Sequence, residues 1–154
     1  MKTKLFIIVS CGLLLLAAGC KKNKDKDLVS FVGNQPIPTW TAPTQYDMTN
    51  SMTAVVRIDL ARQFPITAAD FEIKGNDLLA AFIGGKCVGV ASPQDGLFYL
   101  YITGQTTDSE MVSLRYYSAH YKNLFEAVDV FPFRNDTNIG TVAEPYVPML
   151  VVFE

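Results

Sequence analysis

The cysteine at position 20 stands in the sequence context that is most specific for a chemical reaction. It directly follows residues 16–19 (Leu-Ala-Ala-Gly), which close an apolar run that begins at Leu5, behind two lysines. A basic start, an apolar middle and small residues before a break are typical of a bacterial export signal. The run from Leu5 to Ala18 holds 14 residues, whereas a helix needs roughly 20 to span a bilayer. The pattern therefore favours a cleaved signal over a permanent anchor.

Residues 16–20 (Leu-Ala-Ala-Gly-Cys) resemble a lipobox, the cleavage site of lipoprotein signal peptidase, although Ala17 stands where this pattern usually has leucine. The resemblance implies that residues 1–19 are a lipoprotein signal peptide and that Cys20 becomes the lipidated, palmitate-carrying N-terminus. It also implies a lipid anchor in the outer membrane, at either the cell surface or the periplasmic face. The alternative is an ordinary signal peptide with a chance cysteine.

The charged stretch that follows predicts a tether. Residues 20–27 comprise Cys20 and then Lys-Lys-Asn-Lys-Asp-Lys-Asp, with no apolar side chain to bury. Each lysine near an anionic membrane adds about 1 kcal/mol of attraction, and a lipid chain with a basic patch makes anchoring durable. The alternative is a plain spacer that keeps the domain off the membrane.

The other two cysteines favour no catalytic thiol. Cys11 lies inside the predicted signal peptide, and Cys87 lies in a strand-like stretch with no partner for a disulfide. A nucleophilic thiol needs a neighbouring base, and His120 is the only histidine of the chain. We therefore predict that Cys87 is a buried, inert thiol.

The domain after the tether is acidic. Residues 28–154 contain seven Lys and Arg and 13 Asp and Glu, a net charge of about −6. Binding of nucleic acid needs clustered basic residues that contact phosphates. The composition therefore excludes a nucleic-acid-binding function.

Alternating apolar and polar residues predict strands rather than helices in this domain. The predicted strands cover residues 52–58, 71–74, 78–83, 86–91, 97–103 and 111–119, with one or two more within 121–133 and a last one within 146–153. Gly84 and Gly85 join two continuous apolar runs, which predicts a tight hairpin near the middle of a sheet. Pro145 and Pro148 place the last strand at a sheet edge. We expect an all-β fold over residues 28–154, an antiparallel β-sandwich of about seven to nine strands.

Residues 77–91 have the form D-x-L-A-A-F-x-G-G-x-C-x-G-V-A. This form resembles the recurring core of a β-sandwich module of secreted and surface lipoproteins in Bacteroidota-type bacteria. Looser similarity extends over residues 40–150, including Trp40 and Tyr46. The resemblance implies the sandwich fold and an envelope location, and it carries no assigned activity and no catalytic residues.

Trp40 is the first candidate for ligand binding. It is the only tryptophan, and it lies in a lead-in, residues 28–50, whose prolines exclude a helix and favour extended chain. A flat indole ring suits the apolar face of a sugar ring. The alternative is that Trp40 packs over one end of the sandwich and fixes the lead-in.

Tyr99 and Tyr101 are the second candidates. Residues two apart in a strand share a face, so both tyrosines point away from Phe98, Leu100 and Ile102, which we predict to be core. Further aromatic residues of this cluster are Tyr116, Tyr117 and Tyr121. An exposed tyrosine pair binds a glycan or a protein partner, whereas the alternative is aromatic pairing across strands within the sheet.

Two groups of oxygen-bearing side chains are weak candidates for Ca²⁺. The first comprises Thr106, Thr107, Asp108 and Glu110, and the second comprises Asn76, Asp77 and Asp95. Calcium takes six to eight oxygen ligands, and neither group has the spacing of a dedicated calcium loop. We therefore predict solvated loop acids, with no metal and no cofactor.

Together these patterns predict a non-catalytic envelope lipoprotein that acts as a binding or adhesion module, with glycans among its candidate ligands. The alternative is a structural or accessory subunit that docks on another envelope protein, which predicts an uncovered edge strand or apolar patch. An enzyme is the third possibility. The two carboxylates of a glycoside hydrolase can come from distant positions that only folding brings together, so they need not form a sequence motif. No G-x-S-x-G motif surrounds a serine.

Overall fold

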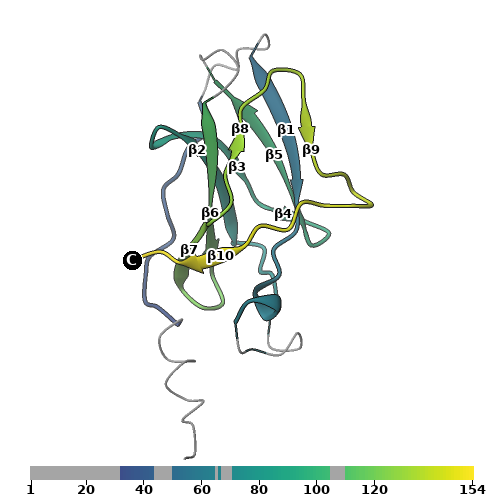
Figure 1. Ribbon diagram of the computed structural model, residues 1–154. Coiled ribbons are helices and arrows are strands. Elements are labelled where there is room, and N and C mark those ends of the chain that lie inside the picture. Colours follow the sequence, from purple (N-terminus) through teal and green to yellow (C-terminus); the bar gives the residue numbers. More distant parts are fainter. Residues whose placement is uncertain (1–31, 44–49, 65, 67–70, 105–109) are drawn as a thin grey trace, which may run out of the picture.

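Short strands are the main regular structure in the part of the chain that the structure describes. The computed structural model describes residues 32–43, 50–64, 66, 71–104 and 110–154 (Figure 1). Its strands are β1 (Ser51–Val56), β2 (Leu78–Ile83), β3 (Lys86–Ala91), β4 (Pro93–Gln94), β5 (Leu97–Thr103), β6 (Met111–Ser118), β7 (Asn123–Ala127), β8 (Phe131–Pro132), β9 (Asn138–Ile139) and β10 (Leu150–Val152). One short 3-10 helix, η1 (Leu60–Arg62), follows β1. None of the described helical structure is long and apolar enough to cross a membrane.

Two sheets pack face to face as a β-sandwich, which confirms the predicted fold class (Figure 1). The four-stranded sheet has the order β4-β5-β1-β9, and the six-stranded sheet has the order β10-β7-β6-β2-β3, with β8 paired to β6. Every strand pair is antiparallel except β1 with β9. The described strands outnumber the seven to nine that we predicted. The strands outside every predicted range are β4 and β9, which hold two residues each, too few to leave an alternating pattern.

The hydrophobic core fills the space between the sheets with the inward residues of each alternating strand. From the four-stranded sheet come Met52, Ala54, Val56, Phe98, Leu100 and Ile102. From the six-stranded sheet come Leu79, Ala81, Val112, Leu114, Tyr116, Phe125 and Ala127. Full burial of a large apolar side chain contributes about 1.5–3 kcal/mol, so this layer is the main source of stability. The inward orientation predicted for the apolar residues of β5 is confirmed.

Glycines shape the hairpin of β2 and β3. Gly84 (φ +55°) and Gly85 (φ +80°) both adopt the left-handed conformation that the predicted tight turn requires. As predicted, β2 lies inside its sheet, but β3 is an end strand, so that part of the prediction is wrong. The apolar character of β3 has another cause, since β3 packs closely against β5. A Cβ atom on Gly89 would lie 2.6 Å from the backbone oxygen of Tyr101, so only glycine fits there.

The strand predicted over residues 71–74 is wrong. This segment forms no strand, although Phe71 and Ile73 pack partly against the core. The backbone N–H of Lys74 donates to Oδ2 of Asp77 (3.1 Å), and the backbone N–H of Asp77 donates to the Lys74 carbonyl (3.0 Å). These bonds close a turn around Gly75 and use backbone groups that strand pairing would need.

The lead-in, described here over residues 32–43, is extended as its prolines predict, and it lies along the six-stranded sheet (Figure 1). The backbone N–H of Gly33 donates to the Tyr121 carbonyl (3.0 Å), and that of Gln35 donates to the Lys122 carbonyl (2.9 Å). A Cβ atom on Gly33 would lie 2.7 Å from the carbonyl oxygen of Lys122. The lead-in is therefore an integral part of the sandwich at its β6–β7 end.

The last strand is an edge strand, as the tail prolines predict. β10 follows Pro148 and pairs on one side with β7. The Gln63 side chain, just after η1, donates to the Pro148 carbonyl (2.9 Å) and accepts from the Leu150 backbone N–H. This side chain fixes the start of β10 against the rest of the fold.

Candidate functional site

The outer face of the four-stranded sheet carries Tyr99 and Tyr101. Both side chains point away from the core on β5. Tyr99 is 41% exposed, and Tyr101 is half-buried. Val55 lies opposite Tyr99 on β1, and Thr53 lies opposite Tyr101. Neither of these neighbours is aromatic, so β1 provides no ring for the alternative of cross-strand aromatic pairing. We call these four residues the tyrosine face.

Polar groups border the tyrosine face on the side of β9. The Thr53 hydroxyl donates to Oδ1 of Asn138 (2.8 Å), and Nδ2 of Asn138 donates to the Gly140 carbonyl. These bonds hold the Asn138 carboxamide in one orientation beside β1. Arg57, two residues beyond Val55, is exposed. The face thus combines an exposed phenol ring with fixed polar groups at its border.

Trp40 lies elsewhere, on the outer face of the six-stranded sheet. Its ring packs edge-on against the ring of Phe82 on β2, with 5.7 Å between the centroids and 80° between the planes. The guanidinium of Arg115 lies over the same Phe82 ring at 4.7 Å. Trp40 is half-buried. The structure therefore does not bring Trp40 together with Tyr99, and this contact is the kind that the packing alternative describes.

Asp77 forms a well-connected polar cluster, although the only site that the sequence predictions considered for it was a calcium site. Its side chain is completely buried. Oδ2 accepts from the Tyr116 hydroxyl (2.6 Å) and the Lys74 backbone N–H (3.1 Å), while Oδ1 accepts from the Ala119 backbone N–H (2.8 Å). Burial and then the Asp77 carboxylate raise the pKa of Tyr116, so that its hydroxyl stays protonated and donates. The only sequence signal for this role is an acid directly before an apolar strand.

The remaining tyrosines of the predicted cluster serve the structure. Tyr116, Tyr117 and Tyr121 are all buried. The Tyr117 hydroxyl donates to the Gln35 carbonyl (3.1 Å) and so attaches the lead-in to β6. Burial, followed by Asp77, raises the pKa of Tyr117. These three rings are therefore unavailable as an exposed binding platform.

Cys87 is half-buried, less covered than we predicted. Its Sγ lies 3.7 Å from the Gly89 carbonyl oxygen and donates to it. Burial raises the pKa of this thiol, which disfavours the nucleophilic thiolate at neutral pH. His120 is exposed between β6 and β7, where its ring packs edge-on against Tyr121 at 4.5 Å. Among the described contacts, none joins Cys87 and His120.

The candidate calcium groups do not form a site within the described residues. Asp108 and its threonine neighbours lie outside that part of the chain, and Glu110 is exposed. Asp77 is buried and already accepts three hydrogen bonds, whereas Asp95 is exposed in the turn between β4 and β5 of the other sheet. No group of three or more His, Cys, Asp or Glu side chains suited to a metal ion occurs among the residues described.

The predicted export signal, Cys20 and the tether lie outside the described residues, so lipidation stays a prediction from sequence. Tyr46, part of the looser module similarity, lies outside them as well. Comparison of the chain with protein-family models, with curated proteins and with solved structures finds no match. A function is therefore proposed below from the sequence motifs and the geometry of the described residues alone.

Proposed function

We propose that this chain is a non-catalytic, lipid-anchored protein of the bacterial outer membrane whose sandwich binds glycans through the tyrosine face. The carrying observation is the exposed ring of Tyr99 beside Tyr101 on a sheet face. A flat aromatic ring suits the apolar face of a sugar, and its hydroxyl can hydrogen-bond the sugar edge. Within the described structure no residue hydrogen-bonds the Tyr99 hydroxyl, which leaves it for a ligand.

A non-catalytic role is supported by the state of the reactive side chains. The raised pKa of Cys87 disfavours its thiolate, and the Asp77 carboxylate is committed to three structural hydrogen bonds. His120 packs against a tyrosine ring at the surface. Among the residues that the structure describes, none of the three has the partner that general acid, general base or nucleophilic catalysis needs.

The envelope location is supported by the lipobox-like residues 16–20 and by the module-like residues 77–91. Replacing Cys20 by serine should abolish metabolic labelling with palmitate and release the protein from the membrane fraction. The control is Cys11→Ser, which leaves the predicted acylation site in place. Labelling that survives in the Cys20→Ser chain would sink the lipoprotein assignment.

Glycan binding is tested by array screening of residues 28–154. We expect specific glycan signals that Tyr99→Ala and Tyr101→Ala remove while thermal unfolding of both variants stays near that of the wild type. Met111→Ala is the matched control, since Met111 is 49% exposed on the other sheet. The absence of any glycan signal, or an equal loss with Met111→Ala, would contradict the proposal.

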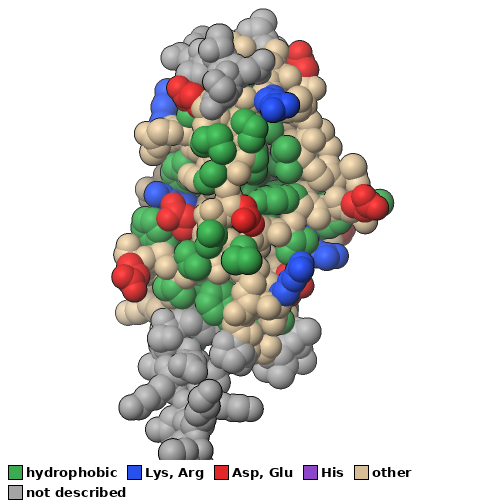
Figure 2. Space-filling view, viewed as in Figure 1, with side chains coloured by type: hydrophobic (Ala, Val, Ile, Leu, Met, Phe, Trp, Pro, Cys, Tyr) green, Lys and Arg blue, Asp and Glu red, His purple; other side chains and the backbone are tan. Residues whose placement is uncertain are grey.

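A second candidate function is an accessory subunit that docks on another envelope protein. A different surface favours it, namely the edge of β10 on which no described strand pairs and the exposed side chains beside it, Val128, Val130, Met149 and Val151. Figure 2 shows hydrophobic side chains gathered over this face of the molecule. Crosslinking in the native envelope tests this function. We expect a crosslinked partner that Val151→Lys removes, and a chain that crosslinks to nothing would exclude the docking role.

A further inference from the structure

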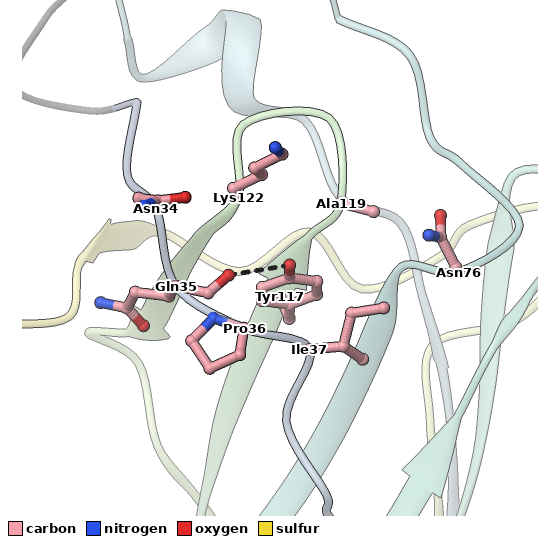
Figure 3. A pocket seen from close by; sticks show the side chains of 8 residues that line it. All are labelled: Asn34, Gln35, Pro36, Ile37, Asn76, Tyr117, Ala119 and Lys122. Atoms are coloured by element: carbon pink, nitrogen blue, oxygen red, sulfur yellow. Dashed lines mark hydrogen bonds between the residues drawn. The ribbon is translucent and has the colours of Figure 1, made fainter.

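A hollow of about 410 Å³ opens at the β6–β7 end of the sandwich, away from the tyrosine face. Figure 3 shows its walls, which are the lead-in at residues 34–37, the turn before β2 at Asn76 and the β6–β7 turn at Lys122. This volume falls within the range of small-molecule sites, about 300–1,000 Å³. The hollow is thus large enough for a single sugar ring.

The rim of the hollow carries polar side chains from three separate segments of the chain. Figure 3 shows Asn34 and Lys122 on one side and Asn76 on the other. Within the described part of the chain, the side chains of these three residues make no hydrogen bond. Two carboxamides and an ammonium group offer donors to hydroxyl and carboxylate oxygens, and the carboxamides also offer acceptors.

The floor of the hollow is apolar. Ile37 is 51% exposed, and Pro36 lies next to it. Behind them lies the Tyr117 ring, whose hydroxyl is occupied by the Gln35 carbonyl. An apolar floor below a polar rim matches a sugar ring, which has an apolar C–H face and a polar edge.

Hydrogen bonds fix the walls relative to one another. The buried Asp77 carboxylate holds the turn before β2, through Lys74, and the β6–β7 turn, through Ala119. The lead-in is held to the β6–β7 turn by the bond from the Gln35 N–H to the Lys122 carbonyl. A site whose walls are held in place loses little entropy when a ligand binds.

The charge at the rim selects among sugars. Lys122 is exposed, and neither of the two nearby described acids forms an ion pair with it. Asp77 is buried and accepts three hydrogen bonds from other groups. Glu72 pairs with Lys74. An ammonium group that has no anionic partner among the described residues favours a ligand that brings a carboxylate.

We propose that this hollow binds a carboxylated sugar of the uronic-acid class. The sugar carboxylate pairs with Lys122, its hydroxyls bond to Asn34 and Asn76, and its ring covers Ile37. The site is separate from the tyrosine face, and neither proposal depends on the other.

The test is a titration with sodium glucuronate, followed by two-dimensional NMR and by fluorescence of Trp40, the single tryptophan of the same lead-in. The protein is the chain from residue 20 onward with Cys20→Ser, which keeps it free of lipid. We expect shifts of the backbone signals of residues 34–37, 76 and 119–122, and weaker shifts with glucose, which lacks the carboxylate.

Lys122→Asn is the decisive variant, because Lys122 has φ +49° and asparagine tolerates this conformation. We expect affinity for glucuronate to fall at least about tenfold, which corresponds to about 1.4 kcal/mol. Lys86→Asn, at the exposed β2–β3 hairpin, and Tyr99→Ala should leave affinity unchanged. Three results would each overturn the proposal: no shift with about 50 mM glucuronate, a weak-affinity limit; equal binding of glucose; or full affinity in Lys122→Asn.

Discussion

Replacing Tyr116 by phenylalanine removes one buried hydroxyl group. The ring stays in place against Phe98 and Phe125, with centroids 5.9 Å from each, and only the hydroxyl is lost, with its hydrogen bonds to Asp77 and Ser118. Donor and acceptor belong to completely buried residues and lie 2.6 Å apart. A hydrogen bond to a charged group contributes about 1.5–3 kcal/mol. We expect the free energy of unfolding at pH 7 to fall by about 2 kcal/mol, which lowers Tm by about 8 °C in a domain of this size.

The same substitution should change the response to alkaline pH. Burial and then Asp77 raise the pKa of Tyr116 above the ordinary value of 10.0. The unfolded chain therefore loses this proton at a lower pH than the folded chain, and the stabilisation is complete below pH 10 and falls as pH rises further. The loss is about 1.4 kcal/mol per pH unit for one such group. Burial also raises the pKa values of Tyr117 and Tyr146. The variant therefore keeps the part of the alkaline loss of stability that comes from these two tyrosines.

Chemical denaturation between pH 7 and pH 11 measures both effects. Tyr99→Phe is the matched control, because it removes an exposed hydroxyl with no hydrogen-bond partner among the described residues. The control should stay within about 0.5 kcal/mol of the wild type, as most surface substitutions do. A similarly small change at pH 7 in Tyr116→Phe, or an unchanged slope above pH 10, would refute the stabilising role of the Tyr116–Asp77 bond.

Three further predictions follow from close contacts. Gly89→Ala should destabilise the fold by about 3 kcal/mol or more, measured by thermal unfolding, because the new Cβ would clash with the Tyr101 carbonyl; a change below about 1 kcal/mol would mean that β3 can move away. Arg115→Ala should cost about 1.5 kcal/mol in urea denaturation, since its guanidinium lies 4.4 Å from the Phe153 ring centroid; Arg115→Lys should recover only part of this. Cys87 should react with a disulfide reagent at pH 8 more slowly than a free cysteine, because burial raises its pKa; an equal rate would show that the thiol is not shielded.

Much of the fold could be predicted because local patterns end at residues with strong turn preferences. The runs at β2, β3 and β5 each have a glycine-containing turn on at least one side, and their bounds agree with the prediction. β9 could not be predicted, since Asn138 and Ile139 become a strand only by pairing with Thr53 and Ala54, far away in the sequence. The false strand at 71–74 arose because its alternation is real, while the Asp77 side chain takes the backbone donor.

The candidate sites also differ in whether local sequence patterns can predict them. Period-two geometry alone was enough to place Tyr99 and Tyr101 on one outer face. The hollow could not be predicted, because Asn34, Asn76 and Lys122 belong to three distant segments that only the tertiary structure brings together. Nor does the sequence show that the partner of Trp40 is a ring on β2.

The attachment of the lead-in also determines how the domain carries mechanical load. A pull on the chain that precedes Val32 is transmitted first to the backbone bonds that join Gly33 and Gln35 to the β6–β7 turn. The next resistance along the lead-in is the packing of Trp40 against Phe82. Force from the N-terminal side therefore detaches the lead-in before it acts on the paired strands. The lead-in thus bears the load first, and the sandwich core stays folded while the lead-in detaches.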